Sequence, residues 1–416
     1  MRFLHLADLH LDTPFTTRSD AVRRELKEAG RIALERAVEL ALSERIDALL
    51  IAGDLFDGEQ LSFHTERFLH QSMARLSSAG VQVVYATGNH DPGGAGGHAR
   101  RMEWPEGVTL LLDPKPRVVP IHREGELVGR VTGAGHGSAR EERDLASTFP
   151  RPQGDVPEIA LLHTQVLGTP GEAHHDRYAP SHLAQLKASG YDYWALGHIH
   201  LRQELAETPP IHYPGNLQGR HPGESGPKGG LLVQVAQNRT HVDFVELAPI
   251  RWEVLVMDEL DHAHSLADLA RLVENRWTQA RESDPGTPEA KWILRLNLAG
   301  RSPLHRELSD PEEQLQLSQE LAIRLDLLDV EIRAEAIRPP LAPADHRNRM
   351  DVLGEALRIL EELTTEDGPS PSRTLGLSEG ELAALGRAEL DPYLRELLRS
   401  EEPELLQALL VEGETP

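Results

Sequence analysis

Four short segments of the chain carry aspartate, asparagine and histidine, the side chains best suited to hold divalent metal ions. They are Asp8-Leu9-His10, Gly53-Asp54-Leu55-Phe56-Asp57, Gly88-Asn89-His90-Asp91 and Gly197-His198-Ile199-His200. Carboxylate and amide oxygens mixed with imidazole, in a chain with no cysteine, suit Mn²⁺, Fe²⁺ or Zn²⁺, with Mn²⁺ favoured. Two such ions can deprotonate a water molecule and balance the charge of a departing oxygen. The residue types therefore indicate hydrolysis of phosphoesters.

Each candidate ligand follows an apolar run that is typical of a β-strand. We expect strands at 3–7, 48–52, 81–86, 159–162 and 193–196, which lead into Asp8, Asp54, Asn89, His163 and His198. Apolar residues at helical spacing predict helices at 21–43 and 62–78. Because the carboxyl ends of strands gather at one edge of an α/β sheet, these distant residues can meet in space.

The spacing within the segments indicates how the ligands divide between two ions. Asp8 and His10 lie two residues apart where the chain leaves a strand, so both can reach one ion. Asp54 follows a glycine that clears space, and one carboxylate can bridge two cations roughly 3.5 to 4 Å apart. We assign the bridge to Asp54. His198 and His200 can address different ions if the backbone turns between them.

The segment Gly88-Asn89-His90-Asp91 combines a ligand with a candidate catalytic group. Asn89 offers a neutral carbonyl oxygen. His90 stands next to it with a ring free to face substrate, and a group that titrates near neutrality suits protonation of a leaving alkoxide. Asp57 and Asp91 are interpreted as acceptors that orient imidazoles.

The remaining histidines are interpreted by their place relative to the expected strands. His163 is a single-residue match, for which an ordinary surface role is the alternative. The others, including His136 and His212, do not follow an expected strand, and we expect them at the surface.

Length and composition limit the class of protein. A chain of 416 residues with 39% hydrophobic and 26% charged residues predicts a globular protein with a large catalytic domain and one or two smaller ones. A membrane-spanning helix needs an apolar run of about 18 residues, and no segment of the sequence comes near this length. We therefore expect no membrane segment and a cytoplasmic location. The net charge of −24 has the wrong sign for a surface that binds nucleic acid throughout. Any affinity for DNA would depend on local cations such as Arg100, Arg101 or Arg220.

The pattern of apolar residues predicts three regions. Further strands at 117–131 and 231–247 indicate that the first region contains two stacked sheets. In the second, alternating strands and helices predict a small α/β module, in which Asp310 caps a helix at 311–325. The regions are 1–248, an α/β catalytic domain; 249–338, a small α/β cap domain; and 339–416, an acidic helical tail.

The tail contains apolar helical faces whose role the sequence leaves open. One face carries Leu353, Leu357 and Leu360, and leucines recur between residues 390 and 410. Ser378 and Glu381 have the spacing of a capping box. Packing against the same chain and docking of a partner are both compatible with this pattern.

The ordered motifs D-x-H, G-D-x-x-D, G-N-H-D, a lone histidine and G-H-x-H resemble the calcineurin-like metallophosphoesterase superfamily over about residues 1–240. The segments 3–11 and 53–57 are similar to its DNA-repair exonuclease branch, which includes SbcD and YhaO-like proteins, and 213–220 is especially similar to the latter. The resemblance implies a four-layer α/β/β/α sandwich with a small α/β cap domain and a helical C-terminal tail. In this branch the cap domain faces DNA.

The same resemblance implies a site and an activity. One ion would be held by Asp8, His10, Asp54 and His200, and the other by Asp54, Asn89, His163 and His198, with His90 at the scissile phosphate. The activity implied is that of a Mn²⁺-dependent 3′ to 5′ exonuclease and single-strand endonuclease in DNA repair. A homodimer and an SMC-like ATPase partner are also implied.

Two alternatives remain open. The same metal chemistry serves phosphoesterases that act on nucleotides, cyclic nucleotides or phosphoproteins, because the fold and the metal site do not select the substrate. The chain could instead be a scaffold that recruits an ATPase through its C-terminal helices and has a vestigial site. Hydrolysis of duplex DNA beside small phosphodiesters, with Mn²⁺, distinguishes these functions.

Overall fold

The computed structural model describes residues 1–57, 61–170, 177–236, 239–339, 349–365, 367–374 and 390–399. The expected capping box at Ser378 and the leucines beyond 400 lie outside these residues. The chain divides into two compact units. The first comprises Met1–Val254, Ser283–Leu294 and Asp326–Asp329, and the second Leu255–Glu282, Arg295–Leu325 and Val330–Pro416.

The first unit contains two six-stranded sheets. In the first sheet four parallel strands lie side by side, and a hairpin extends them on the β1 side with antiparallel pairing. Its order is β12 (Arg239–Glu246), β11 (Gly229–Ala236), β1 (Arg2–Leu6), β2 (Ala48–Ala52), β3 (Gln82–Ala86) and β4 (Val108–Leu111).

In the second sheet four parallel strands are flanked by an antiparallel strand at each edge. Its order is β5 (Arg117–Arg123), β6 (Glu126–Ala134), β7 (Glu158–His163), β8 (Tyr193–Gly197), β10 (Pro210–Tyr213) and β9 (Gln203–Glu207). The run expected as one strand at 117–131 is a hairpin, because Glu124 and Gly125 adopt left-handed φ angles of 52° and 86° and reverse the chain.

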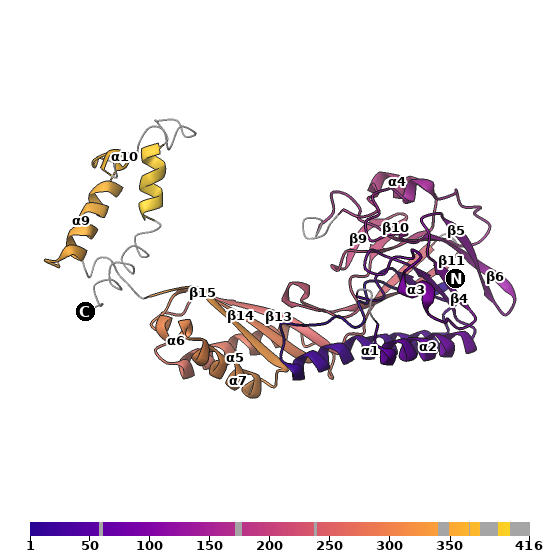
Figure 1. The fold of residues 1–416 in the computed structure, drawn as a ribbon, viewed down its shortest axis with the longest axis horizontal. Helices are drawn as coiled ribbons and strands as arrows, with labels where there is room; N and C mark the ends of the chain where they lie inside the picture. Colours follow the sequence, from indigo (N-terminus) through magenta and orange to yellow (C-terminus); the bar gives the residue numbers. More distant parts are fainter. Residues whose placement is uncertain are drawn as a thin grey trace. The chain divides into compact units, whose positions relative to one another are not determined.

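Helices complete a four-layer sandwich, which confirms the expected fold class. Helices α1 (Asp20–Ser43) and α2 (Phe63–Ser78) cover the outer face of the first sheet, while α4 (Leu183–Ala188) packs on the second (Figure 1). Side chains from both sheets, such as Leu50 and Tyr193, meet in a core between them. The short α3 (His98–Arg101) follows β3.

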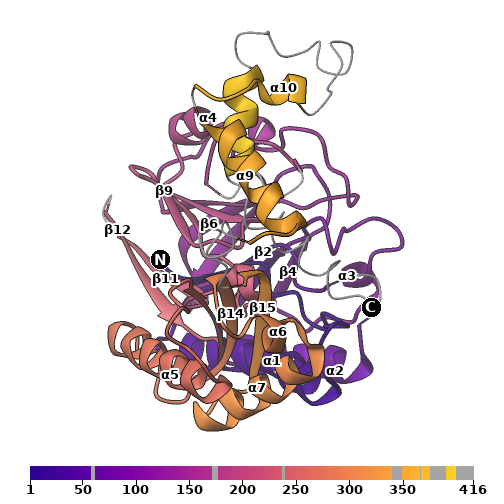
Figure 2. The same cartoon turned by 90° about the vertical axis from the view of Figure 1, so that its left-hand side faces the viewer.

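A smaller three-stranded sheet follows the sandwich in sequence, in the order β13 (Ile250–Met257), β14 (Lys291–Arg301) and β15 (Asp329–Arg338). Helices α5 (Leu266–Ser283) and α7 (Pro311–Arg324) lie on one face of it, and α6 (His305–Ser309) precedes α7 (Figure 2). Asp310 caps α7 as expected, since its carboxylate accepts a hydrogen bond of 2.8 Å from the amide of Glu312.

The tail forms α9 (Val352–Thr364), α10 (Pro371–Thr374) and a helical segment at 390–399. Of the predicted face, Leu353 and Leu357 are buried on α9 and Leu360 is half-buried, while Leu363 is buried as well. Arg395 donates a hydrogen bond of 2.6 Å to the carbonyl of Leu363, so the segments of the tail contact one another. Among the described residues, no helix combines the length and the apolar character that crossing a membrane requires.

Candidate metal centre

The carboxyl ends of β1, β2, β3, β7 and β8 deliver the predicted ligands to one edge of the two sheets. Hydrogen bonds between the loops that follow β1 and β2 fix this edge: the amide of Asp8 donates to Gly53 (3.1 Å) and that of His10 to Asp54 (2.9 Å). Each of the seven predicted ligand residues lies close to at least one other of the seven. They divide into two groups that are held in different ways.

The first group consists of Asn89, His163 and His198, and we call it the backbone-backed group. Asn89 Oδ1 lies 2.9 Å from His163 Nε2 and 3.1 Å from His198 Nδ1. On its other side, His163 Nδ1 lies 2.9 Å from the carbonyl oxygen of Ala52 in β2. Because that carbonyl can only accept, Nδ1 carries the proton and Nε2 keeps a lone pair that faces the centre.

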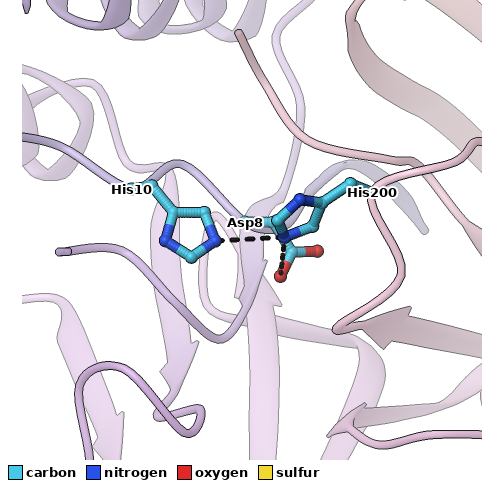
Figure 3. Close-up of side chains that lie close together, drawn as sticks. All are labelled: Asp8, His10 and His200. Carbon is cyan, nitrogen blue, oxygen red and sulfur yellow. Dashed lines mark hydrogen bonds and ion pairs between the residues drawn. The ribbon is translucent and has the colours of Figure 1, made fainter. Parts of the chain in front are cut away.

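The second group consists of His10 and His200, and we call it the carboxylate-backed group. Their Nε2 atoms face each other at 3.2 Å, and His200 Nε2 lies 3.8 Å from Asp8 Oδ1 (Figure 3). Behind the rings, Glu224 Oε1 lies 2.6 Å from His200 Nδ1, and Asp57 Oδ1 lies 3.7 Å from His10 Nδ1. Two imidazole nitrogens aimed at one point suit a cation between them.

Asp54 lies between the two groups. Its Oδ2 is 3.7 Å from His10 Nε2 and 3.4 Å from His163 Nε2. Burial and the nearby charge of Asp91 raise the pKa of Asp54 to about 7, and burial followed by the charge of Asp54 raises the pKa of Asp8. Buried carboxylates that repel one another are stabilised by cations, so this donor set fits divalent metal ions.

The backbone at the centre is strained at the ligands themselves. Asp8, His10 and Asp54 adopt left-handed φ angles of 52°, 45° and 51°, and His198 adopts 108°. Such conformations cost of order 1–3 kcal/mol each, and they persist where the surrounding structure requires them. Gly53, with a φ of 88°, leaves room for His163, because a Cβ at this position would overlap its ring.

His90 is placed differently from the ligands. Its side chain is 42% exposed, whereas those of His10 and His163 are buried. The Nδ1 atom lies 3.0 Å from Asp57 Oδ1, and this hydrogen bond raises the pKa of His90. The ring lines a cavity of about 580 Å³ that also reaches Asp54, Asn89, His198 and His200. A histidine with a raised pKa therefore stands at the wall of the space where a substrate would meet the metal ligands.

Comparison with known proteins identifies the family. The calcineurin-like phosphoesterase family matches residues 1–202, and the family described as Metallophosphoesterase YhaO, middle domain, matches residues 252–337. The chain is 34% identical over 307 residues to a Bacillus subtilis protein named uncharacterized metallophosphoesterase YhaO, which covers 73% of this chain and 72% of that protein. The chain belongs to the calcineurin-like metallophosphoesterase family. It is a hydrolytic enzyme with a dinuclear metal centre, as expected from its motifs.

Two further relatives of this metallophosphoesterase have names that state an activity. It is 27% identical to the DNA double-strand break repair protein Mre11 of Methanopyrus kandleri, over 61% of each chain. It is 39% identical to the SbcD component of the SbcCD nuclease of Rhodobacter capsulatus, over 49% of this chain and 59% of that one. The metallophosphoesterase thus spans about three fifths of the length of each of these two relatives.

In this metallophosphoesterase Asp91 connects the loops that follow β2 and β3 through hydrogen bonds. Its carboxylate accepts hydrogen bonds from the amides of Gly88 (2.6 Å), Leu55 (2.5 Å) and Asp54 (3.3 Å), and from the Tyr85 hydroxyl. These partners are main chain and tyrosine, so the carboxylate does not orient an imidazole as the sequence suggested. The reason is its burial beneath the loops that follow β2 and β3, where unpaired amides need an acceptor.

The expectation that the other histidines lie at the surface is wrong for three of the described ones, because His5, His136 and His212 are buried. His136 follows the end of β6, a strand parallel to β7, and its Nε2 donates a hydrogen bond of 2.8 Å to the carbonyl of His163. The strand expected at 117–131 ended before the last residues of β6, which hid this placement. His212 stacks on Tyr193, with ring centroids 5.6 Å apart.

Sequence reasoning also missed residues that the segment after β10 supplies. Glu224 is buried and holds His200, while Arg220 and Lys228 line the cavity with Tyr178. None of them follows a strand of the parallel sets, so the rule that found the ligands could not find them. The resemblance of 213–220 to YhaO-like proteins was the available signal, although it assigned no role to Arg220.

Proposed function

We propose that this metallophosphoesterase is a DNA phosphodiesterase of DNA repair, with 3′ to 5′ exonuclease and single-strand endonuclease activity. The observation that carries the hydrolytic part is the convergence of the predicted ligands at one edge of the sheets, where Asp54, Asn89, His198 and His200 line a cavity together with His90. The choice of DNA is supported by the printed names of the relatives, a component of a nuclease and a double-strand break repair protein. Residues 252–337, which match the middle domain of YhaO, lie where the resemblance to the exonuclease branch implies a cap domain that faces DNA.

We further propose that the cofactor is a pair of divalent ions, with Mn²⁺ favoured by the mixture of oxygen and imidazole donors. Asp54 would contribute its carboxylate to both ligand sets, since Oδ2 lies 3.7 Å from His10 Nε2 and 3.4 Å from His163 Nε2. Asp8, His10 and His200 would complete one set, and Asn89, His163 and His198 the other. When bound, the two ions supply a nucleophilic water and balance charge at phosphorus.

The protein's own contribution to the reaction is a positioned proton and a fixed set of ligands. Asp57 holds His90 through Nδ1, so Nε2 of a protonated ring is available to donate its proton to the departing alkoxide oxygen. The broken P–O bond leaves its electron pair on that oxygen, and the imidazole becomes neutral. Asp91 and the strained loops keep Asp54 and Asn89 in place, so the ligands need no reorganisation.

A second candidate function is hydrolysis of nucleotides, cyclic nucleotides or other small phosphodiesters. A cavity of about 580 Å³ is of the size that accepts a small ligand, and the net charge of −24 disfavours broad contact with DNA. Of the cations considered for DNA, Arg220 lines the cavity, whereas Arg100 donates to the carbonyl of Gly93. Phosphoprotein substrates have the same chemistry and belong to this alternative.

The deciding experiment compares substrates on the Mn²⁺-loaded full chain. Duplex and single-stranded DNA, labelled at either end, are incubated beside bis(p-nitrophenyl) phosphate, a cyclic nucleotide and a phosphopeptide. We expect shortening from the 3′ end and cleavage of single strands. Chelator-treated protein is the control for metal dependence. Turnover of the small esters with intact DNA would refute the nuclease and support the second function.

We also propose a homodimer with an SMC-like ATPase partner. Support comes from the relative named as a component of the SbcCD nuclease, and from Val352 and Ile359, the exposed apolar residues of α9, as a candidate docking element. The proposed domains are 1–248, 249–338 and 339–416, and the cytoplasmic location stays a prediction. A scaffold function in repair, separate from hydrolysis, would be indicated if a tail deletion abolished repair while His90→Ala left repair intact.

A further inference from the structure

Arg220 is a cation at the centre that neither the metal ligands nor the proton donor accounts for. It lines the cavity together with Asp54, Asn89 and His90. Its side chain is 17% exposed, and its Nε is buried without a hydrogen-bond partner among the described residues. Guanidinium loses much hydration when it is buried this far, so an unpaired donor there has a cost that a ligand in the cavity can remove.

The contacts of the guanidinium with carboxylates are long. Nη1 lies 3.6 Å from Asp57 Oδ2, and Nη2 lies 3.4 Å from Glu224 Oε1. A charge-assisted N–H···O⁻ bond is about 2.7–2.9 Å, so neither contact is a full one. The third neighbour, His200 Nδ1 at 3.2 Å, already engages Glu224 at 2.6 Å. These three groups therefore attract the guanidinium of Arg220, but its N–H groups can still donate hydrogen bonds to a ligand.

The main chain around Arg220 is held more firmly than its head group. The amide of Arg220 donates a hydrogen bond of 2.7 Å to Glu224 Oε2, which also accepts from Asn216 Nδ2 at 2.8 Å. One residue earlier, the carbonyl of Gly219 accepts a hydrogen bond of 2.8 Å from the indole of Trp252. A fixed backbone with a loosely paired guanidinium is the arrangement expected of a residue that waits for an anionic ligand.

Arg220 and His90 are linked through one carboxylate. His90 Nδ1 lies 3.0 Å from Asp57 Oδ1, and Arg220 Nη1 approaches Asp57 Oδ2. Thr13 donates a hydrogen bond of 2.8 Å to the same Oδ2, so Asp57 is fixed independently of both cations. The carboxylate of Asp57 therefore contacts two hydrogen-bond donors, His90 and Arg220, and both of them line the cavity.

We propose that Arg220 is a further catalytic residue, whose guanidinium binds a non-bridging oxygen of the scissile phosphodiester while His90 protonates the leaving oxygen. The inference rests on the proposed function and extends it from the metal ligands to a phosphate-binding side chain. Arg220 keeps its protons throughout and contributes charge where negative charge grows on the phosphoryl oxygens. The competing role is structural, in which Arg220 only balances the charges of Asp57 and Glu224.

The test compares Arg220→Gln, Arg220→Lys and Arg220→Ala with the matched control Arg202→Gln. Arg202 lies near the site, with its guanidinium 3.9 Å from the centre of the Phe244 ring, but it does not line the cavity. Three quantities are measured on the full chain: metal content per chain, the Kd of inorganic phosphate for the Mn²⁺-loaded protein, and kcat for bis(p-nitrophenyl) phosphate and single-stranded DNA.

We expect Arg220→Gln to keep its metals, to bind phosphate at least about 10-fold more weakly, and to lose about 10²–10³-fold in kcat. The phosphate affinity and kcat of Arg220→Lys should lie between those of Arg220→Gln and the original protein. An ammonium group keeps the charge but lacks the planar pair of donors of a guanidinium. Guanidinium ion added to Arg220→Ala should restore part of the activity. The control Arg202→Gln should stay within about threefold of the original protein in all three quantities.

Several outcomes would overturn the inference. Loss of metal in Arg220→Gln and Arg220→Lys together, with no rescue by guanidinium, would assign Arg220 a structural role. An unchanged kcat with unchanged phosphate affinity would show that it does not touch the phosphoryl group. If the original protein hydrolyses neither ester, the proposed function fails by itself, and the phosphate Kd still decides whether Arg220 binds the anion.

Discussion

The two groups of the metal centre lie side by side but depend on different parts of the chain. In the backbone-backed group, His163 is fixed by a main-chain carbonyl of β2, so the sheet itself orients the ligand. In the carboxylate-backed group, His200 depends on Glu224, a side chain from the segment after β10. The first group follows from the sandwich alone, whereas the second also requires that the segment 213–224 be correctly placed.

The difference has a chemical consequence. A carboxylate behind an imidazole raises the basicity of the ligand more than a carbonyl does, so it strengthens metal binding and adds negative charge. It is also easier to lose, because one substitution removes it, whereas no substitution removes the carbonyl of Ala52. We therefore expect the carboxylate-backed group to be the one whose metal affinity side-chain substitutions tune.

The largest effect should come from Asp54→Asn, which acts on both groups. The variant keeps the shape of the side chain but loses the charge that faces His10 and His163. We expect both metals to bind weakly and hydrolysis to fall to background, measured by metal analysis and ester turnover. The matched control is Asp243→Asn, on an exposed part of β12. Retention of one metal at full occupancy would contradict the bridging position.

His90→Ala should separate catalysis from metal binding. Asp57 Oδ1 lies 3.0 Å from Nδ1 of this ring and 3.7 Å from Nδ1 of His10, yet His90 lies at the cavity wall instead of among the buried ligands. We expect hydrolysis to fall by about 10²–10⁴-fold, as for loss of a general acid, with metal content unchanged. The exposed His64→Ala is the control. Loss of metal from His90→Ala would show that the ring is a ligand.

Glu224→Gln tests the comparison directly. Removing the charge behind His200 should weaken metal binding in the carboxylate-backed group by about 10–100-fold and leave the backbone-backed group unchanged. Dialysis against graded chelator, with metal counted per chain, should show one ion lost well before the other. The exposed Glu207→Gln serves as the control. Equal loss of both ions would show that the charge of Glu224 does not act on the carboxylate-backed group alone.

The smallest effect on metal binding should come from His136→Phe. His136 supports the backbone-backed group through the carbonyl of His163, which the variant leaves without this donor, and through an edge-on contact with the His163 ring at 5.2 Å, which an aromatic replacement can keep. We expect the free energy of unfolding to fall by about 1–3 kcal/mol and the metal affinity to change less than about 10-fold. Urea denaturation and a metal titration measure the two quantities, with the exposed His122→Phe for comparison. A larger loss of metal than in Glu224→Gln would reverse the proposed order.

The sequence predicted the fold class well because the strands that carry the ligands are short, apolar and nearly uninterrupted. Strand β2 has the residue limits expected, and β3, β7 and β8 differ by a residue or two. The hairpin of β5 and β6 was expected as one long strand, since Glu124-Gly125 is a weaker turn signal than the apolar residues around it. The run expected at 231–247 is likewise divided, into β11 and β12. Residues that precede no helix and end no parallel strand, such as Glu224, had no local signal.

Residue type and order alone determined the metal chemistry of this protein. Aspartate, asparagine and histidine at the ends of apolar runs, without cysteine, specify oxygen and imidazole donors, and parallel strands must bring such ends to one edge. Only the tertiary structure decided which group stands behind each ring. That choice depends on contacts such as His200 with Glu224 or Arg220 with Asp57, which join residues whose separation in sequence carries no periodic signal.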